Sequence, residues 1–243
     1  MDTNRKEQSI KHHEFILEND KGDIENAVKH STIYNEYSDA NTSQVLRVAE
    51  TDCLSAAIAV RNENTRAAIT ILNFASFTKP GGGYMNGARA QEEYLCNESN
   101  LWEILNDEVF EEFYNENRKE DNIQDGLYKN RAIFTPNVKF HRDGIDYYFN
   151  VLTCAAPNYK RAIQNNIPHN VILDKYKSRV RFIYNILHDK HQDFFISGAW
   201  GCGVFGFPRD ISKDIFAKTA SVNTLLAIPS KGNFENKRSV KNL

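Results

Sequence analysis

The chain has 243 residues, of which 41% are hydrophobic and 26% are charged, and its formal net charge is -2. A chain of this size and composition can bury one sizeable core, so we expect a single domain overall. The near-neutral charge gives no electrostatic reason to bind a nucleic-acid backbone, so we expect no direct DNA binding. We also expect a monomer.

The four cysteines are widely spaced and form no C-x-x-C pair, so neither a disulfide framework nor a zinc site is predicted. No apolar run approaches the length of a membrane span. The first residues, MDTNRKEQSIKHHEF, lack the apolar core of a secretory signal peptide. These features predict a cytoplasmic protein. Secretion into a host cell as an effector stays open as an alternative.

The first half of the chain begins with polar, helical sequence. Residues 1–44 are expected to form a helical extension that packs on the core, with ENAVKHSTIYNEY (25–37) as its clearest amphipathic piece. A strand is then expected over 43–51 and a helix over 52–63, with Asp52 as its N-cap. The run AAITILNFAS (67–76) is short and apolar, which is typical of a buried strand.

The helical spacing of apolar residues resumes at Gln91 and continues or restarts through 108–120. The second half repeats the alternation of strands and helices. Strands are expected over 131–136, 146–157, 193–200 and 223–230, and helices over 171–191 and 209–221. This alternation predicts an α/β layered domain with a largely parallel or mixed sheet, covering residues 45–230, followed by a tail over 231–243.

Two glycine-rich loops follow buried strands of this predicted sheet. The first is GGG (81–83) and the second is GCGVFG (201–206). Ligands of open α/β sheets bind at the carboxyl ends of strands, and glycines let backbone N–H groups approach phosphate oxygens. Two such loops therefore favour a phosphate-containing ligand over two plain tight turns.

The second loop also fits the dinucleotide fingerprint G-x-G-x-x-G. That fingerprint normally opens the first βαβ unit and is followed by an acidic residue about twenty positions later. Here it lies near the C-terminus, Pro208 follows it, and no acidic residue ends the next strand, so a nicotinamide-dependent dehydrogenase is disfavoured. Neither loop continues into the Gly-Lys-Ser/Thr of a Walker-type site.

Gln91, Glu92 and Glu93 end the first glycine segment. Two carboxylates at a helix N-terminus can simply complement the helix dipole. In a cleft, however, desolvation and a like-charged neighbour raise a carboxyl pKa, and such a group can act as general acid on a glycosidic oxygen. Consecutive helical residues point about 100° apart, so one carboxyl should catalyse while the other holds substrate.

Several motifs in this order resemble the microbial type of poly(ADP-ribose) glycohydrolase. They are GGGYMNGARAQEE, TPNVKFHRD, TCAAPN and SGAWGCGVFG, and the resemblance covers roughly residues 45 to 230. It implies a macrodomain-like fold, a three-layer α/β/α sandwich with a mixed, largely parallel central sheet. It also implies hydrolysis of ADP-ribosyl bonds with no metal and no cofactor.

The resemblance further implies roles for individual residues. Glu93 would protonate the leaving group at the anomeric carbon of the distal ribose and then activate water, while Glu92 would bind ribose hydroxyls. Phe205 would pack against the distal ribose, and Gln91 would fix the catalytic turn. The implied substrate-binding residues are Asn73, Ser76, Gly81, Gly82, Gly83, Gln91, Gly201, Cys202, Gly203, Val204, Phe205 and Gly206.

Other candidate residues have two interpretations each. Cys202 is a possible nucleophile, but a small residue in a tight loop is favoured because no His or acidic partner is identifiable. Trp200 and Phe207 either stack on adenine or close the core. His188 and His191 are expected at the solvated end of a helix rather than at a metal. Phe234, Asn236 and the basic tail are expected either to cap the nucleotide or to be disordered.

Three functions are therefore weighed for the chain. The favoured one is an ADP-ribosyl glycohydrolase that removes ADP-ribose from poly(ADP-ribose) or from mono-ADP-ribosylated side chains. The second is an effector-type hydrolase of ADP-ribosyl-arginine on a host protein. The third is a macrodomain reader that binds ADP-ribose without cleaving it. The expected partner is thus ADP-ribose or an ADP-ribosylated protein, and the intact Glu92 and Glu93 favour an enzyme over a reader.

Overall fold

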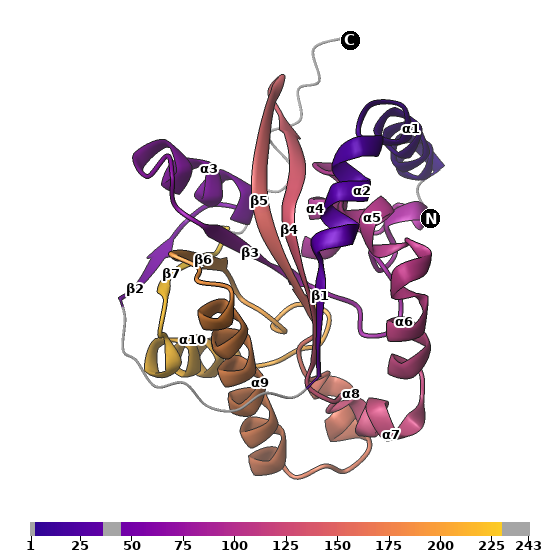
Figure 1. The fold of residues 1–243 in the computed structure, drawn as a ribbon. Coiled ribbons are helices and arrows are strands. Elements are labelled where there is room, and N and C mark those ends of the chain that lie inside the picture. The colour runs from indigo at the N-terminus through magenta and orange to yellow at the C-terminus, as the bar shows by residue number, and fades with distance from the viewer. Residues whose placement is uncertain (1–2, 36–44, 230–243) are drawn as a thin grey trace.

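A seven-stranded sheet forms the centre of the protein, with helices on both faces (Figure 1). The computed structural model describes residues 3–35 and 45–229. The strand order is β1-β4-β5-β3-β6-β7-β2. The strands are β1 (Thr32–Asn35), β2 (Leu46–Ala49), β3 (Ile69–Phe74), β4 (Arg131–Arg142), β5 (Ile145–Cys154), β6 (Phe194–Ser197) and β7 (Asn223–Ala227).

The sheet is mixed but largely parallel. Strands β5, β3, β6, β7 and β2 run parallel to one another, while β4, near one edge, is antiparallel to both of its neighbours, β5 and β1. The parallel strands are rich in buried apolar residues, as in β3 (ITILNF), because helices cover both of their faces. The carboxyl ends of β5, β3, β6 and β7 consequently meet at one edge of the sheet.

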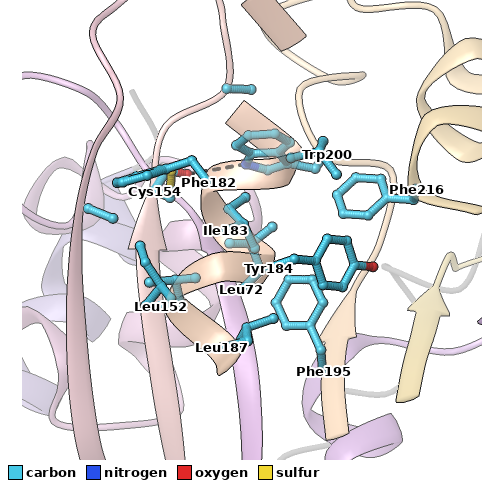
Figure 2. Packing of buried hydrophobic residues seen from close by; sticks show 14 of the residues in the cluster. Leu72, Leu152, Cys154, Phe182, Ile183, Tyr184, Leu187, Phe195, Trp200 and Phe216 are labelled. Atoms are coloured by element: carbon cyan, nitrogen blue, oxygen red, sulfur yellow. Dashed lines mark hydrogen bonds between the residues drawn. The ribbon is translucent and has the colours of Figure 1, made fainter. Parts of the chain in front are cut away.

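The helices divide into two layers. Apolar residues of α9 and α10 pack with Leu72, Leu152 and Phe195 on one face of the sheet (Figure 2). Residues of α2 to α6 pack with Ile71, Val151 and Ile196 on the other. The helices are α1 (Thr3–Asn19), α2 (Lys21–His30), α3 (Cys53–Glu63), α4 (Gln91–Asn97), α5 (Leu101–Leu105), α6 (Glu111–Asn117), α7 (Glu120–Ile123), α8 (Tyr159–Gln164), α9 (His169–Asp189) and α10 (Arg209–Thr219). The predicted three-layer α/β/α architecture is confirmed.

Some predicted elements differ from the observed ones. The predicted amphipathic helix over 25–37 is partly wrong: α2 ends at His30, and TIYN forms β1, which pairs with residues 131–134 of β4. β-Branched and aromatic residues suit this pleated edge better than a helix. The residues beyond Asn35 in that prediction, and the predicted tail with Phe234 and Asn236, lie outside the described residues.

The helical region after Gln91 is interrupted rather than continuous. Helix α4 ends at Asn97, and α5 and α6 are separated by a short 3-10 turn, Glu108–Phe110, which Asp107 caps by accepting a hydrogen bond from Val109 N at 3.0 Å. This cap provides a local reason for the restart. The prediction of Asp52 as the N-cap of α3 is confirmed, since its carboxylate accepts from Ser55 N at 2.8 Å.

Candidate active site

Gln91 fixes the start of α4 to the end of the central strand β3. Its Oε1 accepts a hydrogen bond from Phe74 N at 2.8 Å, and its Nε2 donates to Leu72 O at 2.7 Å. The side chain thereby occupies backbone groups at the end of a strand, where no neighbouring backbone takes them. The first turn of α4, which carries both glutamates, is thus attached directly to the sheet.

Glu92 is a buried carboxyl with hydrogen bonds to two residues from the end of β3. It is 2% exposed, and its oxygens accept from Asn73 Nδ2 at 3.1 Å and from Ser76 N at 2.7 Å. Burial raises the pKa of Glu92 to about 8, against the opposing effect of these two hydrogen bonds. Asn73 and Ser76, both predicted to contact substrate, therefore also hold this carboxyl.

Glu93 is held by backbone donors on both of its oxygens. Oε1 accepts from Gly83 N at 2.9 Å, and Oε2 accepts from Ala90 N at 2.7 Å. The side chain is 7% exposed. One bond comes from the glycine loop and the other from the residue before α4, so the Glu93 carboxylate joins the two segments and has a fixed orientation.

The glycine triplet provides room for these side chains. Gly81 and Gly82 both adopt φ of +58°, a left-handed conformation that favours glycine. A Cβ on Gly82 would lie 2.5 Å from Glu93 Oε1 and 2.8 Å from Glu92 Oε2. A Cβ on Gly81 would lie 2.4 Å from Trp102 Cδ1. The absence of side chains at these two positions is therefore required by the protein's own packing, independently of any ligand.

The second glycine loop, 201–206, closes on itself at its base and is open at its tip. Gly201 and Gly206 have φ of +75° and +74°, and Phe207 N donates to Gly201 O at 2.9 Å. At the tip, Val204 is 73% exposed, and a Cβ on Gly203 would have no atom within 4 Å. The tip is therefore free to approach a ligand.

The aromatic and sulfur side chains around this loop are mostly structural. Trp200 is completely buried and donates from Nε1 to Cys154 O at 3.2 Å (Figure 2). Phe207 is buried and stacks on Tyr176 with ring centroids 3.8 Å apart. Burial raises the pKa of the Cys202 thiol, which disfavours a thiolate nucleophile. Phe205 is half-buried and meets the Tyr128 ring edge-on.

A cleft of about 300 Å³ lies beside the 201–206 loop at the carboxyl edge of the sheet. Its walls come from the start of α3, the end of β3, the start of α4, the loop between β6 and α10, and the residues after β7. Of the predicted site residues, the cleft is lined by Gln91, Gly201, Gly203, Val204 and Phe205. Glu92, Glu93 and the glycine triplet are not among its lining residues but adjoin it through Gln91 and Ala90.

Several residues of the cleft were missed by the sequence analysis as site residues. Arg89 and Arg209 are exposed on its wall, and among the described residues neither has a hydrogen-bond or ion-pair partner. Tyr94 also lines the cleft, and its hydroxyl donates to Asp52 Oδ1 at 2.8 Å and accepts from Arg142 Nη1 at 2.9 Å. Arg89 lies inside the GARAQEE motif, two residues before Gln91, and this position could have identified it as a candidate site residue.

Burial opposes ionisation of Asp52, but hydrogen bonds from Ser55 and Tyr94 together with the Arg142 guanidinium lower its pKa. An ionised carboxylate therefore lines the cleft.

Within residues 3–35 and 45–229, no group of three or more His, Cys, Asp or Glu side chains is placed to hold a metal ion. In the same ranges, no helix is long and apolar enough to cross a membrane.

The family model described as "Microbial-type PARG, catalytic domain" matches residues 4–143, more than half of the chain. The chain belongs to this family. PARG is poly(ADP-ribose) glycohydrolase, so the protein is a glycohydrolase, and the predicted family resemblance is confirmed. No protein in the curated set matches the chain.

Solved PARG structures share the fold over nearly the whole chain. PARG from Thermomonospora curvata bound to the inhibitor ADP-HPD is 26% identical, covers 94% of this chain and 95% of its own, and has a TM-score of 0.80. Another structure of the same enzyme is 25% identical, covers 92% of this chain and 93% of its own, and has a TM-score of 0.78. PARG from Deinococcus radiodurans in complex with ADP-ribose is 25% identical, with coverages of 84% and 90% and a TM-score of 0.72. The chain and these PARG structures therefore share one fold over most of their lengths.

Proposed function

We propose that the protein hydrolyses the glycosidic bond at the distal ribose of poly(ADP-ribose) and releases ADP-ribose from the ends of the polymer. The observation that carries the proposal is the pair of fixed carboxyls, Glu92 and Glu93, held against the glycine loop beside the cleft. Bacterial relatives with this fold have been solved with ADP-ribose and with ADP-HPD bound. A ligand of that kind suits a cleft lined by the 201–206 glycine loop and adjoined by the segment that carries the two carboxyls.

In the proposed reaction, Glu93 is the acid and then the base. When the glycosidic bond breaks, its electron pair stays on the leaving oxygen, which takes the proton from the Glu93 carboxyl. The carboxylate then accepts a proton from a water molecule whose oxygen bonds to the anomeric carbon. Because both Glu93 oxygens accept N–H bonds in the free protein, protonation makes one of them a weaker acceptor and weakens its bond to Gly83 N or Ala90 N.

Glu92 supports a second assignment of the acid. Its burial keeps this carboxyl protonated near neutral pH, which is the form that a general acid needs. In the favoured assignment Glu92 binds ribose hydroxyls and stores a proton beside Glu93. In the second assignment Glu92 itself donates to the leaving oxygen, and Glu93 stabilises the developing positive charge on the sugar.

The charges of the cleft favour an anionic, diphosphate-containing substrate. Arg89 and Arg209 are cations without partners among the described residues, and both line the cleft. Each unit of poly(ADP-ribose) carries two phosphates, so the polymer places negative charge both inside the cleft and beyond it. A single ADP-ribose on a protein side chain supplies the inner pair as well. The two arginines therefore support a diphosphate-containing ligand, and the choice of poly(ADP-ribose) is supported by the family match.

The test compares Glu92→Gln and Glu93→Gln, which preserve shape and remove the acid. Each variant is assayed with poly(ADP-ribose), with arginine-linked and with serine-linked mono-ADP-ribosyl protein. Loss of at least about 100-fold in kcat for Glu93→Gln, with ADP-ribose binding retained, supports the favoured assignment. Full activity of Glu93→Gln with loss in Glu92→Gln moves the acid to Glu92. Tight ADP-ribose binding by the parent without turnover of any substrate would make the protein a reader.

A further inference from the structure

Helix α1 packs directly on the catalytic glycine loop. Tyr84 follows the triplet immediately, is 1% exposed, and makes both of its hydroxyl contacts with α1. The hydroxyl donates to Ser9 O at 3.1 Å and lies 2.7 Å from His12 Nδ1. Ser9 is buried and His12 is half-buried, so the contact lies inside the protein although the residues are more than seventy positions apart in sequence.

The same helix supports the two ends of the loop. At the far end, Gly87 has φ of +71°, and a Cβ there would lie 3.0 Å from Arg5 Cβ and from Lys6 N. At the near end, Gly81 lies against Trp102, whose ring meets the His13 ring edge-on with centroids 4.9 Å apart. The loop from Gly81 to Gly87 is therefore enclosed by α1 on one side and by the carboxyls of α4 on the other.

Tyr84 is connected to Glu93 through the preceding residue, Gly83, whose N–H bonds the Glu93 carboxylate. Gly83 N donates to Glu93 Oε1 at 2.9 Å, and Tyr84 N donates to Gly81 O at 3.0 Å. Because Gly83 and Tyr84 are adjacent in this turn, holding the Tyr84 side chain restricts the backbone positions open to Gly83 and thus the directions open to its N–H. We propose that Ser9 and His12 of α1 are positioning residues that hold Tyr84 and, through it, the Gly83 N–H on Glu93.

The hydrogen bonds of this arrangement are complete for a neutral His12. Burial lowers the pKa of His12 to about 4, helped by the nearby His141 and His13 and opposed by Asp20. A neutral imidazole with its proton on Nδ1 donates to the Tyr84 oxygen, and the Tyr84 proton goes to Ser9 O. The tyrosine oxygen thus both accepts and donates, and its ring has a single favoured orientation. The proposal rests on the proposed function in one respect, namely that Glu93 is the acid and base of the reaction.

The test uses Tyr84→Phe, which removes one oxygen, and His12→Leu, which removes the donor. His12→Gln keeps an amide N–H in reach and should recover part of the effect. His30→Gln is the matched control, because His30 is exposed on α2 and, within the described residues, hydrogen-bonds to Asn26 O of its own helix alone. Two quantities are measured on each variant: hydrogen exchange of the Gly83 amide by NMR, and kcat with KM on poly(ADP-ribose).

We expect Gly83 exchange to rise about tenfold in Tyr84→Phe and in His12→Leu, in line with the loss of one buried hydrogen bond. We expect kcat to fall about tenfold with KM and the ADP-ribose Kd unchanged within about twofold, because misplacement of a catalytic group affects the chemical step. His12→Gln should lie between parent and His12→Leu, and His30→Gln should match the parent.

Unchanged Gly83 exchange in Tyr84→Phe would overturn the proposal, as would a uniform rise in exchange over the whole domain without a specific effect on kcat. A fully active Glu93→Gln would overturn the proposed chemistry instead. In that case the exchange result would still report whether α1 holds the loop, so the two failures are distinguishable.

Discussion

Gly82→Ala tests whether the glycine triplet exists to admit the two carboxyls. The new methyl would lie 2.5 Å from Glu93 Oε1 and 2.8 Å from Glu92 Oε2, distances that no real Cβ contact tolerates. The residue would also keep φ near +58°, which costs an L-residue roughly 1–2 kcal/mol. Since Gly82 N donates to Lys79 O at 3.2 Å, the turn is held and the carboxyls must move instead.

A shift of about 1 Å at a catalytic group costs on the order of 100-fold in rate, so kcat should fall by that factor. Two matched variants separate the effect of displaced carboxyls from the effects of backbone strain and of an added methyl group. Gly144→Ala has φ of +75° with nothing within 4 Å of its Cβ, so it should lose about 1 kcal/mol of stability and no activity. Gly22→Ala lies in α2 away from the cleft, has no positive φ and has nothing within 4 Å of its Cβ, so it should keep both the stability and the activity.

The assays are thermal unfolding and steady-state hydrolysis of poly(ADP-ribose). At this chain length, 1 kcal/mol corresponds to a Tm shift of about 2–4 °C. Gly82→Ala should lose at least as much Tm as Gly144→Ala, and among the three variants it should show the large drop in kcat. Parental kcat in Gly82→Ala would refute the reasoning, because it would mean that the carboxyl positions in the free protein do not govern catalysis.

The remaining predictions concern charge. Burial raises the pKa of Glu92 from its ordinary 4.5 to about 8, so the folded state keeps a proton that the unfolded state has lost. The stabilisation from Glu92 is therefore present below about pH 4.5 and is lost as pH rises towards 8, and Glu92→Gln should gain Tm relative to the parent over that window. Equal Tm differences at pH 5 and pH 9 would contradict this. Arg89→Gln and Arg209→Gln should each raise KM for poly(ADP-ribose) several-fold at low salt and lose their effect at about 0.5 M salt, where exposed charges are screened. An unchanged KM at low salt would show that these arginines do not contact the polymer.

Much of the fold could be predicted because the signals are local. The buried run of β3 and the long periodicity of α9 each identify their element without reference to the rest of the chain. Strand β1 was predicted as helix because its identity depends on pairing with β4, about a hundred residues away. Short-range patterns carry no information about such a partner.

In the site, too, residues within one motif could be predicted and contacts between distant elements could not. The QEE motif identified Gln91, Glu92 and Glu93, and the structure brings them together with Asn73, Ser76 and Gly83 as hydrogen-bond partners. The contact of Tyr84 with α1 could not be predicted, since it joins residues on separate elements. The glycines were interpreted as room for a ligand. Their first requirement is room for Trp102 and the two carboxyls.

The side chain of Gln91 has a consequence for how the site moves. Because Gln91 bonds Leu72 O and Phe74 N, the helix that carries both glutamates moves together with the most central strand of the sheet. The opposite wall of the cleft ends in Gly203 and Val204. A Cβ on Gly203 would have no atom within 4 Å and Val204 is 73% exposed, so little packing restrains this tip. Entry and release of a nucleotide should thus be accommodated by the 201–206 loop, while the reacting groups keep their places. We therefore expect ligand selection to depend on the 201–206 loop, and the catalytic rate to depend on the attachment of α4 to β3.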